Sequence, residues 1–471
     1  MHFSSWTHDD EGTSITLGEK KDSEISRLRD HNHRQRVFSL PTELLAYIFE
    51  LACLNLAHLP HDVHAYLPIM RRTRYAIATT CYLWREVALS SPELWRFIII
   101  LNDDDAQFFA NLNESSTYTR RMESNKLAAY LCNFPGHLEW HSFQPLLLSM
   151  LGCCEMVVST DIRADDHFQL FSTQRHWPNL RKLGISWTPP HEINAPRTID
   201  LTNAVALESL WIECDFYSRQ HTPVQVTLRW PGSSMIKKLW LTGPSIDPLC
   251  SLPLIQSCLH LEILGWVTYE SMSDLGIEIT DTIHLAHLRE LTTMGDLAMV
   301  FMTKLDAPNL TRLRTSLWRR DYRDIFPLSD TLQFPSLRSL RMNKRDNCIL
   351  DYRVTEDLGK FLRAHGDLQH LYLPWCLNDH KELLGVLGSP SLLPNLEYVT
   401  MEAVLPELTE VEGILKGRLQ GQQPKKFTLY LLPCGLGRSW LEEGAARLVE
   451  KFGDSICCGD PGKSWEWKWE E

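Results

Sequence analysis

The sequence predicts an α/β protein in which a small helical module precedes an irregular repeat solenoid, a curved parallel sheet with helices and loops on its convex side. Two observations support this fold class. Residues 40–95 hold two stretches with helix-start signals and apolar residues at helical spacing. Residues 180–401 repeat a short leucine motif nine times.

The first helix is expected to start at Pro41, since proline suits the first helical position, with Ser39 or Leu40 as the cap. Glu43 then lies near the positive end of the helix dipole. Spacings of three and four residues predict one apolar face, with Phe49 to one side of it. That face consists of Leu44, Leu45, Ile48, Leu51 and Ala52.

A second helix is expected to carry a single apolar stripe made of Ile77, Cys81, Trp84 and Ala88. The following Ser90-Ser91-Pro92-Glu93 repeats the start signal of a capping serine, a proline and an acid. Leu94 and Trp95 are then the first apolar residues of a short final turn. Helices of this size bury little surface alone, so the module should pack on a partner or on the rest of the chain.

Two fragments of this module together resemble an F-box, and most closely the F-box proteins that are numerous in fungi of the basidiomycete type. They run from Leu40-Pro41-Thr42-Glu43-Leu44-Leu45 to Ile48-Phe49, and from Leu83-Trp84-Arg85-Glu86-Val87-Ala88 to Pro92-Glu93-Leu94-Trp95. The resemblance implies docking on a Skp-family adaptor, which is bound to the cullin scaffold of an SCF-type ubiquitin ligase. The matching positions, some of which serve the module's own core, are Leu40, Pro41, Leu44, Ile48, Trp84 and Leu94.

The sequence departs from the family in one place. The stretch from Asn55 to Arg72 is longer than a minimal F-box carries between these helices, which puts the family's middle helix in doubt. The stretch also contains His58, His61 and His64, whose imidazoles are candidate zinc ligands. Pro60 interrupts any helix that would align them and no cysteine pair is nearby, so a solvated loop is the better interpretation.

The leucine motif is a leucine, two variable residues, a second leucine and often a third apolar residue two positions later. Its first positions run from residue 180 to residue 396 over eight intervals, a mean of 27 residues, which is typical of leucine-rich repeats. The spacings vary between 22 and 31 and an asparagine ladder is largely missing, so an irregular solenoid is expected. An ordinary α/β domain with several similar strand starts is the alternative. The pairs are Leu180/Leu183, Leu207/Leu210, Ile236/Leu239, Leu261/Leu264, Leu288/Leu291, Leu310/Leu313, Leu337/Leu340, Leu368/Leu371 and Leu396/Val399.

Turn signals precede several repeats, as in Trp177-Pro178-Asn179 and Leu393-Pro394-Asn395. We expect a weaker early repeat around Leu138-Glu139-Trp140 and a cap near Phe427 to Leu432. The tail from Trp465 to Trp469 is either a terminal strand or a loose end.

Residues that alternate with the buried leucines should lie on the concave face, where such solenoids bind partners. Tryptophan, tyrosine and arginine carry most of the binding energy at interfaces. The stretch from Arg312 to Arg341 is locally basic, which favours an acidic or phosphorylated protein ligand, although arginines on an ordinary solvated sheet are the alternative. The candidate substrate-binding residues are Trp211, Trp240, Arg312, Arg314, Arg341 and Tyr372, with His370 and Glu402 on the same face.

Composition narrows the function classes. The net charge is −12, which argues against a general nucleic-acid binder. The N-terminus lacks an apolar targeting segment, and the longest aliphatic-aromatic run, Phe97 to Leu101, is too short for a membrane helix. The 13 cysteines are scattered and are expected to be reduced, so we expect the cytoplasm or nucleus.

No catalytic residues, metal or cofactor are predicted. The adjacent pairs Cys153-Cys154 and Cys457-Cys458 have poor geometry for chelating one ion, and no phosphate-binding loop, nucleophile elbow or dinucleotide fingerprint is present. A non-catalytic substrate receptor of a ubiquitin ligase is therefore the leading hypothesis. Alternatives are an interaction scaffold that uses its F-box outside any ligase, and a repeat-containing hydrolase or transferase with an unrecognised site.

The expected organisation has four segments. Residues 1–37 are polar and expected to be disordered. The F-box follows over 38–100, a linker over 101–130 and the repeat domain over 131–471.

Overall fold

The computed structural model describes residues 40–54, 63–91, 94, 97–100, 127–132, 154–160, 177–187, 197–214, 226–231, 235–243, 248–267, 279–316, 334–343, 352–375, 381–403, 408–420, 427–433 and 438–458, together with Arg27. Described residues up to Ile99 belong to one compact unit, and those from Ala128 to Cys458 to a second. The expected disordered segment 1–37, the linker up to residue 126, the early repeat at 138–140 and the tail at 465–469 lie outside this range, apart from Arg27.

The first unit contains three packed helices: α2 (Thr42–Leu54), α3 (Val63–Thr80) and α4 (Tyr82–Ser90). The buried face of α2 is made by Leu45, Phe49 and Cys53, each at most 2% exposed. The predicted apolar face was therefore placed wrongly, because Phe49 lies at the centre of the buried side. A helix with apolar residues on two sides does not reveal from its spacing alone which side the neighbouring helices cover.

The predicted second helix is also wrong, because the stripe from Ile77 to Ala88 crosses a helix boundary. Cys81 is the N-cap of α4, with an extended backbone (φ −159°, ψ 171°), and its Sγ accepts a hydrogen bond from the Trp84 amide at 3.4 Å. Ile77 therefore belongs to α3 and Trp84 to α4. A cysteine is not a usual capping residue, so the sequence carried no recognised boundary signal here.

Ser91 differs from its predicted role as well. Its amide donates to the Ala88 carbonyl at 3.2 Å and its Oγ donates to the Val87 carbonyl at 2.8 Å, so it closes the C-terminus of α4. Its own carbonyl accepts from the Leu94 amide at 3.2 Å, which makes it the first residue of the next turn too. Pro92, Glu93 and Trp95 are outside the described residues.

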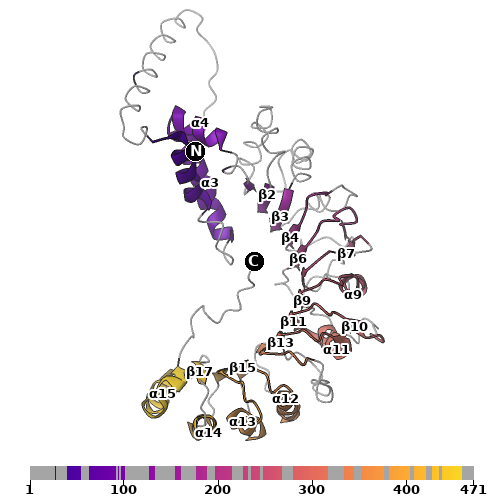
Figure 1. Ribbon diagram of the computed structural model, residues 1–471, viewed down its shortest axis with the longest axis vertical. Coiled ribbons are helices and arrows are strands. Elements are labelled where there is room, and N and C mark those ends of the chain that lie inside the picture. Colours follow the sequence, from indigo (N-terminus) through magenta and orange to yellow (C-terminus); the bar gives the residue numbers. More distant parts are fainter. Residues whose placement is uncertain are drawn as a thin grey trace, which may run out of the picture. The chain divides into compact units, whose positions relative to one another are not determined.

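The second unit is built around a large sheet (Figure 1). Its neighbours from β3 onwards pair in parallel along the sheet, which confirms the predicted α/β class with a large parallel sheet. The strands of this unit follow one another in the order β2 (Leu127–Cys132), β3 (Cys154–Thr160), β4 (Lys182–Trp187), β6 (Ser209–Cys214), β8 (Lys238–Thr242), β9 (Ile263–Val267), β11 (Glu290–Met294), β13 (Arg312–Ser316), β14 (Ser339–Asn343), β15 (His370–Trp375), β16 (Tyr398–Ala403), β17 (Thr428–Pro433) and β18 (Ile456–Cys458). β1 (Phe97–Ile100) belongs, up to Ile99, to the first unit.

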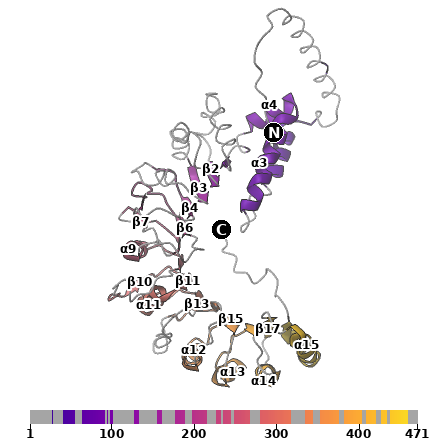
Figure 2. The ribbon, with the colours of Figure 1, turned by 180° about the vertical axis from the view of Figure 1, so that it is seen from behind.

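Within this unit, the helices lie on the outer side of the curved row of strands, as both ribbon views show (Figures 1 and 2). They are α9 (Pro248–Ser257), α11 (Asp296–Lys304), α12 (Tyr352–Ala364), α13 (Lys381–Gly388), α14 (Leu408–Leu419) and α15 (Arg438–Phe452), the last followed by the 3-10 turn η3 (Gly453–Ser455). Two small parallel sheets are formed by segments that connect strands of the large sheet, β5 (Arg197–Asp200) with β7 (Val226–Arg229) and β10 (Ile283–His284) with β12 (Leu305–Asp306).

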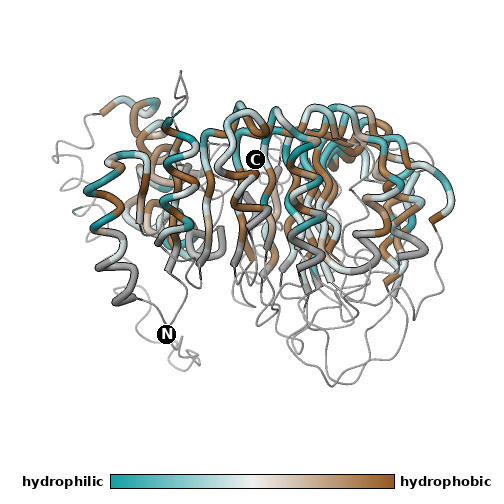
Figure 3. Tube along the Cα trace, turned by 90° about the horizontal axis from the view of Figure 1, so that it is seen from below, coloured by the Kyte–Doolittle hydropathy of each residue, from teal (hydrophilic) through white to brown (hydrophobic). Residues whose placement is uncertain are grey.

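The core beneath the sheet is a ladder of aliphatic residues in register, and Figure 3 shows how apolar segments recur along the unit. The second residue of each leucine motif pairs with its counterpart in the next strand, and none is more than 3% exposed. The twelve positions are Val157, Leu183, Leu210, Leu239, Leu264, Leu291, Leu313, Leu340, Leu371, Val399, Leu429 and Ile456. The repeat therefore extends beyond the nine predicted motifs, and Phe427 to Leu432 opens a further repeat instead of a cap.

A tight turn precedes eight of the nine predicted motifs; residues 232–234, before the motif that begins at Ile236, lie outside the described range. The amide of Leu310 donates to the Ala307 carbonyl at 3.1 Å, and that of Leu337 donates to the Phe334 carbonyl at the same distance. The first residue of the turn is buried in repeat after repeat, and His365 occupies this position before Leu368. The turns predicted from the proline and asparagine signals are thus present where the structure describes them.

Two outer helices approach each other closely. A β-carbon on Gly417 of α14 would overlap the backbone of Gly388 at the end of α13, with its carbonyl carbon at 3.1 Å and its Cα at 3.4 Å. The neighbouring Arg418 is buried and donates to the carbonyls of Leu387 and Leu393, each at 2.6 Å. The first bond satisfies an acceptor in the last turn of α13 that the helix itself leaves open, and the second reaches the turn that precedes β16.

Candidate protein-interaction surfaces

An apolar stripe on α2 remains exposed although the opposite side of the helix is buried. It is made by Leu44, Tyr47, Ile48 and Leu51, which are 50%, 57%, 47% and 41% exposed. Their spacing of three and four residues places them on one side of the helix. Large exposed apolar groups that form one contiguous surface mark a site for a partner. We call these four residues the α2 stripe.

The six residues expected to dock an adaptor divide into two groups. Leu44 and Ile48 belong to the α2 stripe, and Pro41 is exposed beside it, with its carbonyl accepting the Leu45 amide at 3.1 Å. Leu40, Trp84 and Leu94 are at least partly buried; Leu94 is 3% exposed. The ring centroids of Trp84 and Phe49 lie 5.0 Å apart, so this tryptophan serves the interior of the module.

Tyr47 and Leu51 complete the stripe but were not among the expected docking residues. Helical spacing from Leu44 would have found both, at i+3 and i+7. The interior next to them holds the Cys53 thiol, whose pKa is raised by burial, and Arg74, whose charge and hydrogen bond to the thiol act in the opposite direction. This cysteine therefore packs the module and offers no reactive surface group.

The face of the large sheet opposite the leucine ladder carries the second candidate surface. One row of this face, running across the strands in register, reads Gly184, Trp211, Trp240, Gly265, Thr292, Arg314, Arg341, Tyr372 and Thr400. We call it the central row. It includes five of the six expected substrate-binding residues, because alternation along each strand places them all opposite the buried leucines.

The two tryptophans of the central row lie over glycines. A β-carbon on Gly184 would come within 3.0 Å of Cε3 of Trp211, and one on Gly265 would overlap the indole of Trp240. Because glycine leaves room above the backbone, each indole leans across the adjacent strand, and both remain partly exposed. The result is an aromatic platform spread over β4, β6, β8 and β9.

Further along the same row, two arginines occupy adjacent strands. Arg341 stacks over the ring of Tyr372, with its Cζ 4.6 Å from the ring centroid. Arg314 is half-buried, and its Nε has no hydrogen-bond partner among the described residues. Burial and the neighbouring charge of Arg341 lower the pKa of Arg314 to about 10, so the guanidinium is still charged at neutral pH. Like charges directly opposite each other on neighbouring strands are unfavourable.

Arg312, which was also predicted to bind the substrate, does not belong to the central row. It lies in the next row of the same face and forms an ion pair with the buried Glu290 of the adjacent strand. His370 shares that row. Burial lowers the pKa of His370, and the charge of Glu397 acts in the opposite direction. Glu402 is in register with Pro374, and its side chain lies outside the described part of the chain.

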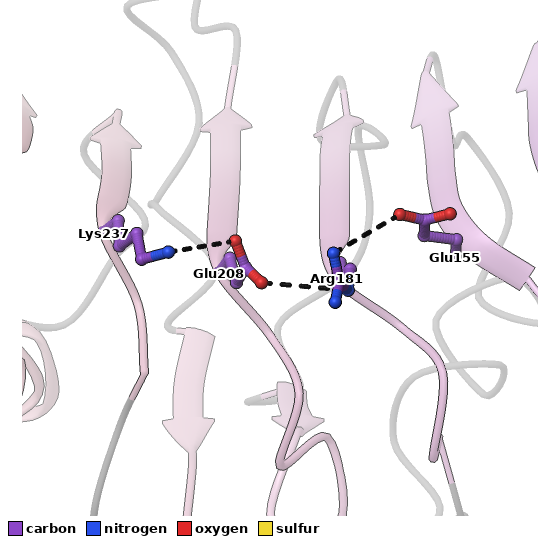
Figure 4. A network of polar contacts seen from close by, with 4 residues as sticks. All are labelled: Glu155, Arg181, Glu208 and Lys237. Atoms are coloured by element: carbon purple, nitrogen blue, oxygen red, sulfur yellow. Dashed lines mark hydrogen bonds and ion pairs between the residues drawn. The ribbon is translucent and has the colours of Figure 1, made fainter.

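A third row of charges lies at the starts of the strands, where acids and bases alternate (Figure 4). Arg181 lies between Glu155 and Glu208, with nitrogen–oxygen distances of 3.9 and 3.7 Å, and Lys237 is 3.4 Å from Glu208. These pairs are exposed and contribute little stability each. In the central row, the partners in register of Arg314 and Arg341 are Thr292, Tyr372 and one another.

The histidines and cysteines considered as metal ligands in the sequence gain little support from the structure. Within the described residues, no group of three histidine, cysteine, aspartate or glutamate side chains could hold a metal ion. His64 lies in α3, so the described part of the expected loop is helical, and His58 and His61 fall outside the described range. Cys154 is buried and Cys457 half-buried. None of the helices in the described residues is long and apolar enough to cross a membrane.

No protein-family model matches this sequence, and no curated protein shows significant similarity to it.

Proposed function

We propose that this chain is the substrate-recognition subunit of an SCF-type cullin-RING ubiquitin ligase. Its helical module is an F-box that binds a Skp-family adaptor, and its second unit is an irregular leucine-rich-repeat domain that binds a protein substrate. The chain itself is not catalytic and acts in the cytoplasm or nucleus. It contributes proximity, because holding a substrate near the charged conjugating enzyme replaces a rare collision with a nearly intramolecular encounter.

The observation that carries this proposal is the α2 stripe. It lies on the helix that bears the Leu-Pro-x-Glu-Leu-Leu sequence of the F-box resemblance. Burying a whole leucine or isoleucine side chain contributes about 1.5–3 kcal/mol, so each half-exposed residue of the stripe still offers roughly 1 kcal/mol. An adaptor that covers Leu44, Tyr47, Ile48 and Leu51 together therefore gains a substantial part of the free energy of a specific association.

The experiment is co-purification of the full chain with a Skp-family adaptor. We expect Leu44→Ala combined with Ile48→Ala to weaken adaptor binding by about 30-fold or more, since central apolar anchors each contribute more than 1 kcal/mol. Both side chains are exposed, so the fold should be unchanged by circular dichroism. Leu259→Ala is the matched control, because Leu259 is 65% exposed but belongs to the second unit.

Retained adaptor binding in the double variant would contradict the proposed docking surface. Reconstitution with the cullin and RING subunits then separates a ligase receptor from a scaffold. A receptor transfers ubiquitin to a captured protein in this assay, whereas adaptor binding without any such transfer favours the scaffold.

A further inference from the structure

Two histidines lie side by side at the edge of the large sheet where its strands begin, on consecutive repeats. His260 precedes β9 and His287 precedes β11, and each stands directly before the first leucine of its motif. Their ring centroids are 5.8 Å apart and the ring planes are inclined by 35°. Both side chains are exposed, and neither ring forms a hydrogen bond with a residue that the structure describes. We call these two residues the histidine pair.

The backbone holds the histidine pair in place. In the first turn, the Leu261 amide donates to the Cys258 carbonyl at 3.1 Å. In the second, the Leu288 amide donates to the Leu285 carbonyl at the same distance. These four flanking residues are at most 1% exposed, so both turns are anchored in the core. β9 and β11 pair in register three residues after the two histidines, which places the two imidazoles at equivalent positions of neighbouring strands.

The same position in other repeats carries side chains that reach back to the preceding repeat. The Nδ2 of Asn309 donates to the Ala286 carbonyl at 2.8 Å, and the Nδ2 of Asn395 donates to Oδ1 of Asp367 at 3.0 Å. Those asparagines link neighbouring repeats directly. The histidine pair brings two rings together at this position without a hydrogen bond between them. An ion held between the two rings would supply the corresponding link.

The separation of the two rings fits a shared metal ion. A bond from zinc to an imidazole nitrogen is about 2.0–2.1 Å long, and the ion lies in the plane of the ring beyond that nitrogen. The centre of each ring is then roughly 3 Å from the ion, so two rings that share one ion have centres roughly 5–6 Å apart. The observed 5.8 Å lies within this range.

The donor set indicates which ions fit. Imidazole nitrogens suit zinc, copper and nickel, whereas calcium and magnesium take oxygen ligands. Among the described residues, no group of three histidine, cysteine, aspartate or glutamate side chains could hold a metal ion. The histidine pair therefore provides two ligands, and a four-coordinate ion would keep two positions open to the solvent.

We propose that His260 and His287 bind a late first-row divalent metal ion, in particular Zn²⁺, which links the repeats of β9 and β11. The two open positions are taken by water or by a donor from a bound protein. This inference does not depend on the function proposed above.

The test measures zinc binding by the full chain in competition with a chromophoric zinc indicator. His260→Asn and His287→Asn should each weaken the tightest zinc site by about tenfold or more, because one of two ligands is lost. Asparagine is accepted at this turn position, as Asn309 shows. His284→Ala is the matched control, since His284 is exposed in the same repeat but its Nδ1 lies 2.7 Å from Oδ2 of Asp306. Its zinc affinity should stay within about twofold of wild type.

Two further variants and a second ion separate coordination from a structural role. His287→Cys supplies another zinc ligand and should retain most of the affinity that His287→Asn loses. With less than one equivalent of Cu²⁺ per chain, electron paramagnetic resonance should show two imidazole nitrogens in wild type and one in either asparagine variant. Joint replacement of His58, His61 and His64 by alanine should leave this two-nitrogen signal unchanged. Thermal melts without metal check that each variant is folded.

The proposal is overturned if wild type binds no zinc, or if both asparagine variants bind it as wild type does. Equal loss of affinity in His284→Ala would also overturn it, because scattered surface histidines would then hold an adventitious ion only. A wild-type copper signal from a single imidazole would contradict the shared ion. Loss of the two-nitrogen signal on replacing His58, His61 and His64 would move the site to that stretch of the chain and refute the assignment to the histidine pair.

Discussion

Replacing Gly417 with alanine should destabilise the second unit, although the same change one turn earlier in α14 should stabilise it. Gly413 has no neighbouring atom within 4 Å of an added β-carbon, so Gly413→Ala should gain the helix propensity of alanine, about 0.5–1 kcal/mol. Gly417→Ala earns the same propensity but drives its methyl group into the Gly388 carbonyl, and backbone cannot move aside as a side chain can. Overpacking costs about 1–3 kcal/mol, and because the propensity gain is common to both variants, they should differ by about that amount in free energy of unfolding.

The assay is urea unfolding of both variants and wild type, followed by far-ultraviolet circular dichroism. Hydrogen exchange of α13 and α14 adds a local measurement, since repeat proteins open in parts. If Gly417→Ala is at least as stable as Gly413→Ala, the close approach of α13 and α14 is not a feature of the folded protein.

Two further outcomes follow from buried cationic or titratable groups. Arg418→Ala should cost about 3 kcal/mol in urea unfolding, because the Leu387 and Leu393 carbonyls lose a buried donor. Lys416→Ala on the exposed side of the same helix should change stability by less than about 0.5 kcal/mol, and equal losses would contradict this. Burial lowers the pKa of His365 below its usual 6.5. The neutral imidazole therefore contributes its full stability above about pH 6.5, and this stability is lost as the pH falls below that value. His365→Phe should flatten the loss of stability as the pH falls below about 6.5, where one proton changes the free energy of unfolding by at most about 1.4 kcal/mol per pH unit, and an unchanged slope would rule out this histidine as the cause.

The repeat could be predicted from the sequence because successive side chains of a β-strand point to opposite faces of the sheet. The second leucine of each motif and the apolar residue two positions later point to the same side, so repetition of the motif predicts both the strands and their register. The same alternation placed Trp211, Arg314 and Tyr372 together on the opposite face before any contact was known. Residues before β3 and after β16 were harder to assign, since Val157 and Ile456 stand in the ladder without a leucine motif around them.

The helical module was less predictable. Spacing showed that α2 has many apolar residues, but both of its sides carry them, and only the packing of α3 and α4 decided that Phe49 is inside and Ile48 is outside. The break at Cys81 was invisible for a similar reason, because a continuous apolar stripe can belong to two helices that turn the same side towards one neighbour.

The sequence by itself determined the α/β class, the repeat period and the face on which each strand residue lies, because these depend on positions a few residues apart. Tertiary structure alone decided which side of α2 stays exposed, that Arg312 pairs with Glu290 while Arg314 lies beside Arg341, and that each tryptophan leans over a glycine of an adjacent strand. The contacts on the sheet join residues from 22 to 27 positions apart in the chain, and this separation varies because the repeats differ in length, so no local pattern encodes them.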